Sequence, residues 1–114
     1  LDMLCAVLSR RGGVYLGDKD VFVNVVGGVT VTDPAVDLAV CSAIKSAVKD
    51  EVLDKEYIYF GEVGLTGEIR GTWGLDSVLS EAQRVGYKGA YIGNTSVRGK
   101  KELKISVVKN IKDI

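Results

Sequence analysis

The sequence predicts an α+β domain in which helices pack on one face of a mixed sheet. Three segments repeat apolar residues every three or four positions, a pattern typical of helices. Several short runs of β-branched or aromatic residues lie between them and are bounded by glycines, which indicates strands and a hairpin. The 114 residues, 46% of them hydrophobic, allow one core, so we expect one domain over residues 1–114.

The first predicted elements are a helix and two short strands. The spacing of apolar residues predicts a helix over residues 2–11, which Asp2 can cap and Gly12-Gly13 can end in a left-handed turn. The β-rich run at 21–26 predicts a strand, and 29–31 a second strand after a glycine bulge or turn. The apolar face of the helix consists of Met3, Leu4, Val7 and Leu8.

A second helix is predicted over residues 34–49. The Asp33 side chain can accept hydrogen bonds from the free amides at its start. Pro34 suits the first helical position, because the N–H group that proline lacks has no partner there. Many of the apolar residues are alanines, which favours close packing against a sheet; they are Ala35, Leu38, Ala39, Ala43, Ile44, Ala47 and Val48.

The rest of the chain alternates between strands, one hairpin and one helix. Asp76 or Ser77 is expected to cap the helix, Gly86 to end it, and Val78, Leu79, Ala82 and Val85 to point inward. The other expected elements are a strand at 57–60, a hairpin at 61–70, strands at 89–92 and 103–108, and a helical turn within 109–114.

Composition excludes several classes of protein. The 15 basic and 15 acidic residues cancel, so the chain is no strongly basic nucleic-acid arm. No apolar run approaches the ~20 residues that cross a bilayer, and no signal peptide begins the sequence, so we expect a cytoplasmic protein with no membrane partner. Two cysteines and no histidine cannot form a four-ligand zinc site, so Cys5 and Cys41 are expected to be buried reduced thiols.

The charges are unevenly placed along the chain. Residues 50–81 contain eight acidic and two basic residues, whereas residues 84–114 contain eight basic and two acidic ones. Ordinary solvated surface is one interpretation of this pattern. The other is a basic face that meets phosphate groups or an acidic face of a neighbouring copy.

The sequence lacks the residues that most catalytic mechanisms require. The G-x-x-x-x-G-K-[ST] phosphate loop is absent, and the glycines at 61, 64, 67 and 71 are better explained by hairpin turns. Glu62 and Glu68 flank that hairpin, with a surface or structural role expected. Without histidine, the remaining hydrolytic option is serine with a lysine base. Ser42 with Lys45, and Ser46 with Lys49, have the helical spacing, but both pairs suit a solvated polar stripe.

Three stretches carry a resemblance to a known family. They are L-D-M-L-C-A-V-L-S-R-R-G-G at residues 1–13, F-V-N-V-V-G-G-V-T-V-T-D-P-A-V-D-L-A-V at 22–40 and G-E-V-G-L-T-G-E-I-R at 61–70. They resemble the Lon-protease-like C-terminal domain of the RadA (Sms) family of bacterial DNA-repair proteins. The resemblance covers essentially all 114 residues and is looser after Gly71.

The resemblance implies a fold similar to domain 2 of ribosomal protein S5. It also implies that the chain is the excised third part of a longer protein, after a zinc finger and a RecA-like ATPase. ATP, Mg²⁺ and Zn²⁺ would belong only to those other parts, and this domain would hold no cofactor. The whole protein would be a hexameric, DNA-dependent ATPase in recombination, repair and the stress response. Its partners would be single-stranded or branched DNA, other copies of itself and the recombinase RecA.

The same resemblance implies that protease chemistry is lost. Active Lon proteases carry a serine nucleophile in P-K-D-G-P-S-A-G and a lysine in G-G-L-K. The matching stretches here are V-T-D-P-A-V-D, one residue shorter, and W-G-L-D, so the two positions fall on Ala35 and Asp76. A methyl group has no nucleophilic oxygen, and a carboxylate cannot serve as an amine base. We therefore expect no catalytic residue in this domain.

The resemblance leads us to expect a non-catalytic platform that assembles subunits and binds DNA. The family's R-P-V is replaced here by Arg70-Gly71-Thr72, and Val78 stands where relatives often carry a basic residue. The residues expected to contact DNA are Arg10, Arg11, Lys19, Arg70, Lys100 and Lys101. One alternative is a Lon-type peptidase that uses Ser42 with Lys45, or Ser77 with a distant lysine. The other is a pure protein-interaction module, which the neutral net charge and acidic middle segment favour.

Overall fold

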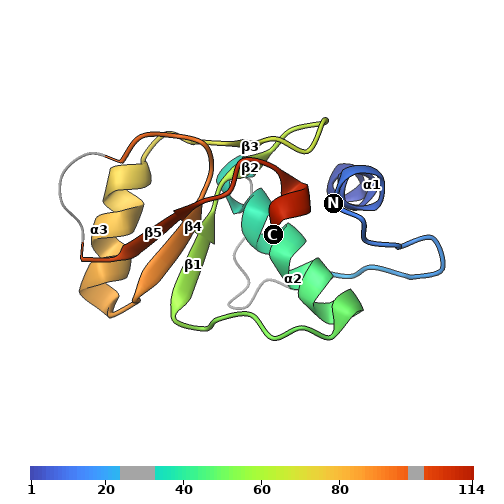
Figure 1. The fold of residues 1–114 in the computed structure, drawn as a ribbon, viewed down its shortest axis with the longest axis horizontal. Coiled ribbons are helices and arrows are strands. Elements are labelled where there is room, and N and C mark those ends of the chain that lie inside the picture. The colour runs from blue at the N-terminus through green and yellow to red at the C-terminus, as the bar shows by residue number, and fades with distance from the viewer. Residues whose placement is uncertain (24–32, 98–101) are drawn as a thin grey trace.

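The computed structural model describes residues 1–23, 33–97 and 102–114 (Figure 1). The predicted strand at 29–31, half of the one at 21–26, and Lys100 and Lys101 lie outside these residues; Val21–Val23 are not in a strand. No helix in the described ranges is long and apolar enough to cross a membrane. The elements are α1 (Asp2–Arg11), η1 (Pro34–Val36), α2 (Asp37–Lys49), β1 (Tyr57–Phe60), β2 (Glu62–Val63), β3 (Ile69–Arg70), α3 (Leu75–Val85), β4 (Gly89–Ile92), β5 (Lys104–Val107) and η2 (Ile111–Asp113).

Parallel and antiparallel pairing occur in two separate sheets within the described part of the chain. The larger sheet has the order β1-β4-β5 and is parallel throughout, with Tyr57 opposite Gly89 and Ile92 opposite Val107. The smaller sheet is the antiparallel ribbon β2-β3. This confirms an α+β domain and the predicted hairpin at 61–70.

The helices α2 and α3 cover opposite faces of the parallel sheet, so the prediction of helices on one face is wrong. In β1, Ile58 and Phe60 pack into the cluster that contains Leu79 of α3, whereas Tyr59 packs into the cluster that contains Leu38 of α2. Neighbouring strand residues point to opposite faces, so the two helices lie on either side, as Figure 1 shows. The physical reason is that β1 is apolar on both faces, and a parallel sheet needs cover on both.

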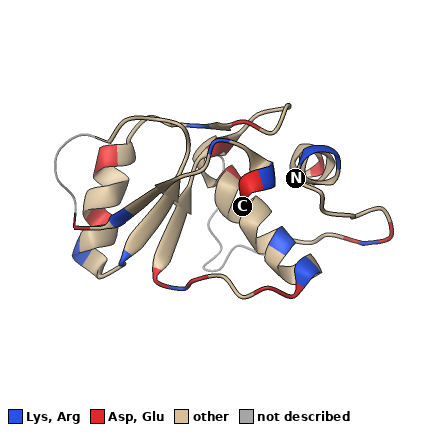
Figure 2. Ribbon diagram, in the orientation of Figure 1, with Lys and Arg blue, Asp and Glu red and all other residues tan. Residues whose placement is uncertain are grey.

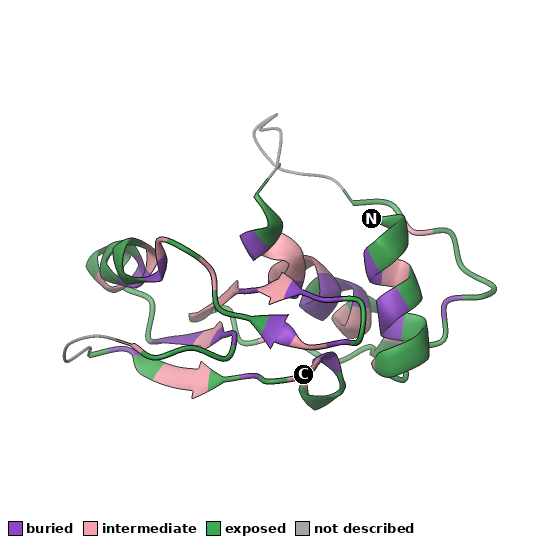
Figure 3. Ribbon diagram, turned by 90° about the horizontal axis from the view of Figure 1, so that it is seen from above, coloured by how far each residue is buried: buried purple, intermediate pink, exposed green. Residues whose placement is uncertain are grey.

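The larger core forms where α1 packs against α2. Leu4, Val7 and Leu8 of α1 are buried there, as predicted, while Met3 remains exposed. Figure 3 shows the buried side of α1 turned toward α2. The smaller core lies under α3, where Leu79 and Ala82 are buried as predicted. Val78 is only partly buried and Val85 is 60% exposed, so the inward prediction fails for Val85.

The helix caps in the structure agree with those predicted from the sequence, with two exceptions. The Asp33 carboxylate accepts a hydrogen bond from the Ala35 amide at 2.9 Å, as predicted, and Gly86 ends α3 with a φ of 110°. However, α3 begins after Gly74, whose φ is 83°, so neither Asp76 nor Ser77 is its cap. Asp2 is likewise the first residue of α1 and makes no side-chain capping hydrogen bond.

The β2-β3 ribbon lies at the carboxyl edge of the parallel sheet. Arg70 forms a parallel bridge with Asn94, just beyond β4, and a side chain at Gly93 would collide with the Arg70 carbonyl. On its other side, the Ile69 amide donates to the Lys109 carbonyl at 3.0 Å. The ribbon therefore connects the sheet edge to η2, which positions the candidate site.

Candidate nucleic-acid interface

Three segments that are distant in sequence meet at the C-terminal end of α1. The Ile111 amide of η2 donates to the Gly67 carbonyl, in the turn of the ribbon, at 2.7 Å. A Cβ built on Gly67 would lie 3.0 Å from the Arg11 Cβ and 3.0 Å from the Ile111 Cγ2. The end of α1, the ribbon turn and η2 are therefore packed together.

Four exposed cations lie on or beside these segments, and we call them the α1–η2 basic face: Arg10, Arg11, Lys109 and Lys112. Figure 2 shows the blue segments of α1 and η2 near each other, and η2 also carries the acidic Asp113. Among the residues that the structure describes, none of the four takes part in an ion pair. Arg10 and Arg11 also suit the negative C-terminal end of the α1 dipole. The face can therefore offer its positive charge to an anionic partner.

Two other predicted DNA contacts are engaged elsewhere. Arg70 lies between two carboxylates, with Nη1 3.9 Å from Glu62 and Nη2 3.6 Å from Glu68, so this trio carries a net negative charge. Lys19 pairs with its neighbour Asp18 at 3.2 Å. Exposed pairs of this kind contribute only about 0–1 kcal/mol to stability, but the acids would repel a phosphate group. Arg70 and Lys19 are thus paired with acids, whereas Arg10 and Arg11 have no ion-pair partner among the described residues.

Sequence reasoning missed Lys109 and Lys112 as members of the site. The signal was present in the excess of basic residues after position 84, but sequence order does not say which of those residues share a face. Only the docking of η2 against α1 and the ribbon turn brings these two lysines near Arg10 and Arg11.

The structure describes both positions that the resemblance matches to the protease dyad, Ala35 and Asp76. Ala35 is buried at the start of η1, and its carbonyl accepts a hydrogen bond from the Gly61 amide at 2.8 Å. Asp76 is exposed in the first turn of α3. Asp33 and Asp76 line the same hollow, of about 700 Å³, so the two segments approach each other.

The serine–lysine pairs of α2 do not form in the structure. Ser42 is only 2% exposed, so its placement on a solvated stripe was wrong, and its hydroxyl has no partner among the described residues. Lys45 instead donates through Nζ to the Ile114 carbonyl, and Ser46 donates to the Glu51 carbonyl. Ser42 and Lys45 line the same hollow, but Lys45 is hydrogen-bonded to Ile114 and not to the serine that it would have to deprotonate.

The thiols lie in the larger core rather than at the basic face. Cys41 is fully buried, and burial, with a smaller contribution from the nearby Asp37 carboxylate, raises its pKa to about 12. Cys5 is partly buried against the same core. In the described part of the chain, no three acidic, cysteine or histidine residues lie together so that they could hold a metal ion.

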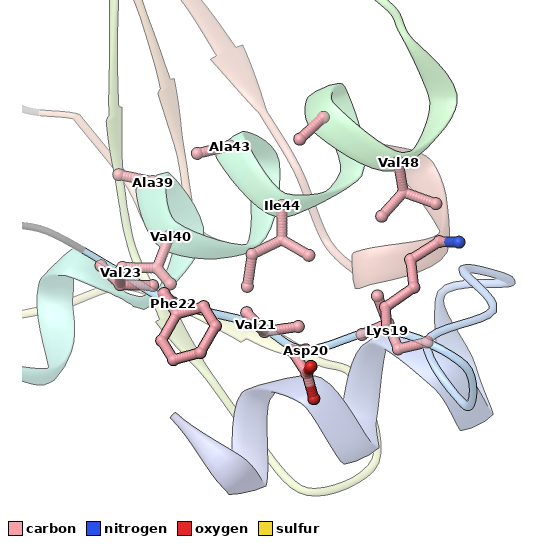
Figure 4. A pocket seen from close by; sticks show the side chains of 12 residues that line it. Lys19, Asp20, Val21, Phe22, Val23, Ala39, Val40, Ala43, Ile44 and Val48 are labelled. Atoms are coloured by element: carbon pink, nitrogen blue, oxygen red, sulfur yellow. The ribbon is translucent and has the colours of Figure 1, made fainter.

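A hollow beside α2 is mostly apolar. Figure 4 shows it between one side of α2, with Ala39, Ala43 and Ile44, and the segment that carries Val21 and Phe22. Its two charged residues have opposite signs, since Lys19 and Asp20 both line it. This lining does not suit a phosphate backbone, so the hollow is not part of the candidate interface.

No protein-family model matches the chain, but its sequence is similar to those of several known proteins. The DNA repair protein RadA of Escherichia coli is 42% identical over 99% of this chain, and that of Streptococcus pneumoniae is 35% identical over 98%. The DNA repair protein RadA of Aquifex aeolicus is 47% identical over 81% of the chain. The chain spans only 25%, 27% and 21% of those three proteins, respectively. The predicted resemblance is therefore confirmed, and the chain is a homologue of one domain-sized segment of the RadA family of DNA repair proteins.

Proposed function

We propose that this chain is the non-catalytic DNA-binding and assembly domain of a RadA-type, ATP-dependent recombination and repair motor of the cytoplasm. The observation that carries the proposal is the α1–η2 basic face, whose four exposed cations lack ion-pair partners among the described residues. The homology to proteins named for DNA repair supplies the context.

Binding on this face would be electrostatic and independent of base sequence. Arginine and lysine side chains on an exposed surface suit phosphate oxygens, and such contacts position a protein on DNA without reading its bases. Release of the counterions that surround DNA supplies the affinity, which therefore falls as salt rises. Single-stranded or branched DNA is the proposed ligand.

Assembly would compensate for the weakness of a four-cation site. We propose a ring, a hexamer in the full-length protein, in which the copies hold the ATPase parts in register. Each copy after the first then binds the same DNA at a high effective concentration, so modest single-site affinities multiply. RecA is a proposed further partner of the whole protein. The domain itself would bind no cofactor, with ATP, Mg²⁺ and Zn²⁺ held by other parts.

The fold proposal is a Lon-protease-like domain, similar to domain 2 of ribosomal protein S5, that has lost its protease chemistry. Ala35 and Asp76 would stand at the former nucleophile and base. The absence of a hydrogen bond between Ser42 and Lys45 supports this proposal over a relocated serine–lysine dyad.

Sedimentation velocity with fluorescently labelled single-stranded DNA, at low and at moderate salt, tests the proposal. A species that carries DNA at low salt and releases it at moderate salt would support phosphate contacts. A size of several copies would support the assembly role. A chain that leaves DNA free at both salts would refute DNA binding by this domain and favour a protein-interaction module.

A separate experiment tests the peptidase alternative. The chain is treated with a serine-directed fluorophosphonate and analysed by mass spectrometry. An unmodified chain is expected, since Ser42 is buried and its neighbour Lys45 bonds elsewhere. A stoichiometric adduct on Ser42 or Ser77 would overturn the non-catalytic assignment.

A further inference from the structure

Two neighbouring hollows lie along α3, at the opposite end of the molecule from α1 and η2 (Figure 1). They are a hollow of about 700 Å³ at the start of α3 and a second of about 470 Å³ between α3 and β1. The two hollows share Phe60, Ser77 and Val78 in their linings, so they adjoin each other. We call the two adjoining hollows together the α3 groove.

The first end of the α3 groove combines an exposed indole with two carboxylates. Trp73 is 98% exposed, and it lines this end together with Asp33 and Asp76. The two carboxylates carry a charge of −2, and the N-terminal end of the α3 dipole contributes about +0.5. The net charge at this end of the groove is therefore about −1.5. No lysine or arginine lines either hollow within the described residues. This end repels phosphate and suits a cation, above all a guanidinium group that can stack on tryptophan and pair with carboxylates.

The other end of the α3 groove is apolar. Val85 is 60% exposed and Tyr87 is 39% exposed, although the amphipathic pattern of α3 predicts Val85 inside. The acid beside them, Glu81, is paired with Arg84. At about 1.5 Å per residue the 11 residues of α3 span about 16 Å, the length of about five residues of extended chain.

The loop that presents Trp73 is held in place. A side chain at Gly71 would collide with Thr95, so the two segments are in close contact, and Arg70 forms a bridge with Asn94. Gly74 has a φ of 83°, a conformation that residues with a side chain rarely adopt and that glycine permits, so the chain can turn into α3 at this point. A recognition residue on a pre-formed loop loses little conformational entropy on binding.

We propose that the α3 groove is a docking site for an extended segment of a partner protein, with an arginine seated between Trp73, Asp33 and Asp76 and apolar side chains following toward Val85. Charge complementarity selects this occupant, since an acidic pocket beside an apolar channel matches a basic residue followed by apolar ones. The site lies apart from the basic face, so its occupancy does not depend on the proposed DNA-binding function.

The experiment uses a labelled seven-residue peptide with one arginine followed by alternating valine and leucine. Two matched peptides replace the arginine by glutamate or the apolar residues by serine. Trp73 is the sole tryptophan of the chain, so its intrinsic fluorescence reports on this site directly. The arginine peptide is expected to change that fluorescence and to bind by polarisation, and each matched peptide to bind at least about tenfold more weakly.

Substitutions in the α3 groove test which residues bind the arginine peptide. Trp73→Ala is expected to weaken the arginine peptide about tenfold. Asp33→Asn, which keeps an oxygen for the Ala35 amide, and Asp76→Asn are each expected to weaken it about threefold to tenfold. Tyr15→Ala and Asp2→Asn, an exposed aromatic and an exposed acid elsewhere, are the controls and should bind normally.

Four results would overturn the proposal. They are no binding of the arginine peptide, equal binding of the glutamate peptide, unchanged binding by Trp73→Ala, and a Trp73 fluorescence response to single-stranded DNA instead. Self-association that Trp73→Ala abolishes would identify a second copy as the occupant and would overturn the assignment to a different protein.

Discussion

Neutralising the two arginines at the end of α1 should halve the salt dependence of DNA binding. The change is Arg10→Gln combined with Arg11→Gln, which keeps side-chain length and polarity but removes two charges. Both residues are exposed and belong to none of the described ion pairs. The substitutions should therefore weaken DNA binding and leave the fold largely unchanged. The weakened interaction with the α1 dipole costs about 0.3–1 kcal/mol per residue, which circular dichroism can check.

The expected magnitude follows from the number of cations on the face. Each phosphate contact with single-stranded DNA contributes about 0.7 to the slope of log affinity against log salt, so four contacts give about −2.8 and two give about −1.4. Between about 50 and 200 mM salt, the native chain should lose about 50-fold in affinity and the double variant about 7-fold.

Fluorescence anisotropy of labelled DNA across this salt range measures both slopes. The matched control is Arg84→Gln combined with Lys88→Gln, which also removes two charges, but from residues paired with Glu81 and with Glu56 at 3.2 Å. The control should keep the native slope. If the α1 variant keeps the native slope while the control reduces it, the assignment of the interface to α1 and η2 is refuted.

Four further predictions concern the fold that holds these sites. Asp33→Ala should lower the free energy of unfolding by about 0.5–2 kcal/mol in urea titrations, whereas Asp33→Asn should nearly retain it, because only the alanine leaves the Ala35 amide without its capping acceptor. Leu79→Ala should cost about 2–5 kcal/mol by the same measurement, since Leu79 is fully buried at the centre of the smaller core. Gly93→Ala should lower the melting temperature by forcing the ribbon away from the sheet edge, and an unchanged melting temperature would contradict the close approach of the Arg70 carbonyl. With a thiol pKa of about 12, Cys41 should resist iodoacetamide at pH 8 in the folded chain and react faster as pH rises; rapid alkylation at pH 8 without denaturant would argue against its burial.

Local interactions explain why much of the secondary structure could be predicted from the sequence. The helix at residues 2–11, the Asp33 cap and the stop at Gly86 each depend on residues within one or two turns of each other. The hairpin at 61–70 follows from β-rich residues around a glycine turn, and Gly67 has the positive φ that such a turn requires. These features need no knowledge of the remaining chain.

Tertiary contacts explain why the start of α3 was predicted at the wrong residue. Ser77 is a better intrinsic cap than Gly74, yet α3 begins after Gly74. The Gly71–Thr95 contact and the Arg70–Asn94 bridge place the loop before α3, and Gly74 supplies the left-handed turn into the helix. Capping preferences of about 1 kcal/mol do not override the packing of a whole loop.

The sequence by itself therefore determined the α+β class, the order of the elements from residue 34 onward and the match of the chain to the RadA family. The tertiary structure alone decided which faces of the sheet the helices cover and which cations share a surface. Arg10 and Lys112 are 102 positions apart in the chain, and the elements that carry them, α1 and η2, come into contact only through the fold. Arg70 and Lys19 have the same charge, yet nearby carboxylates neutralise them. Such pairings arise from long-range packing of the elements, and residue spacing along the chain carries no information about them.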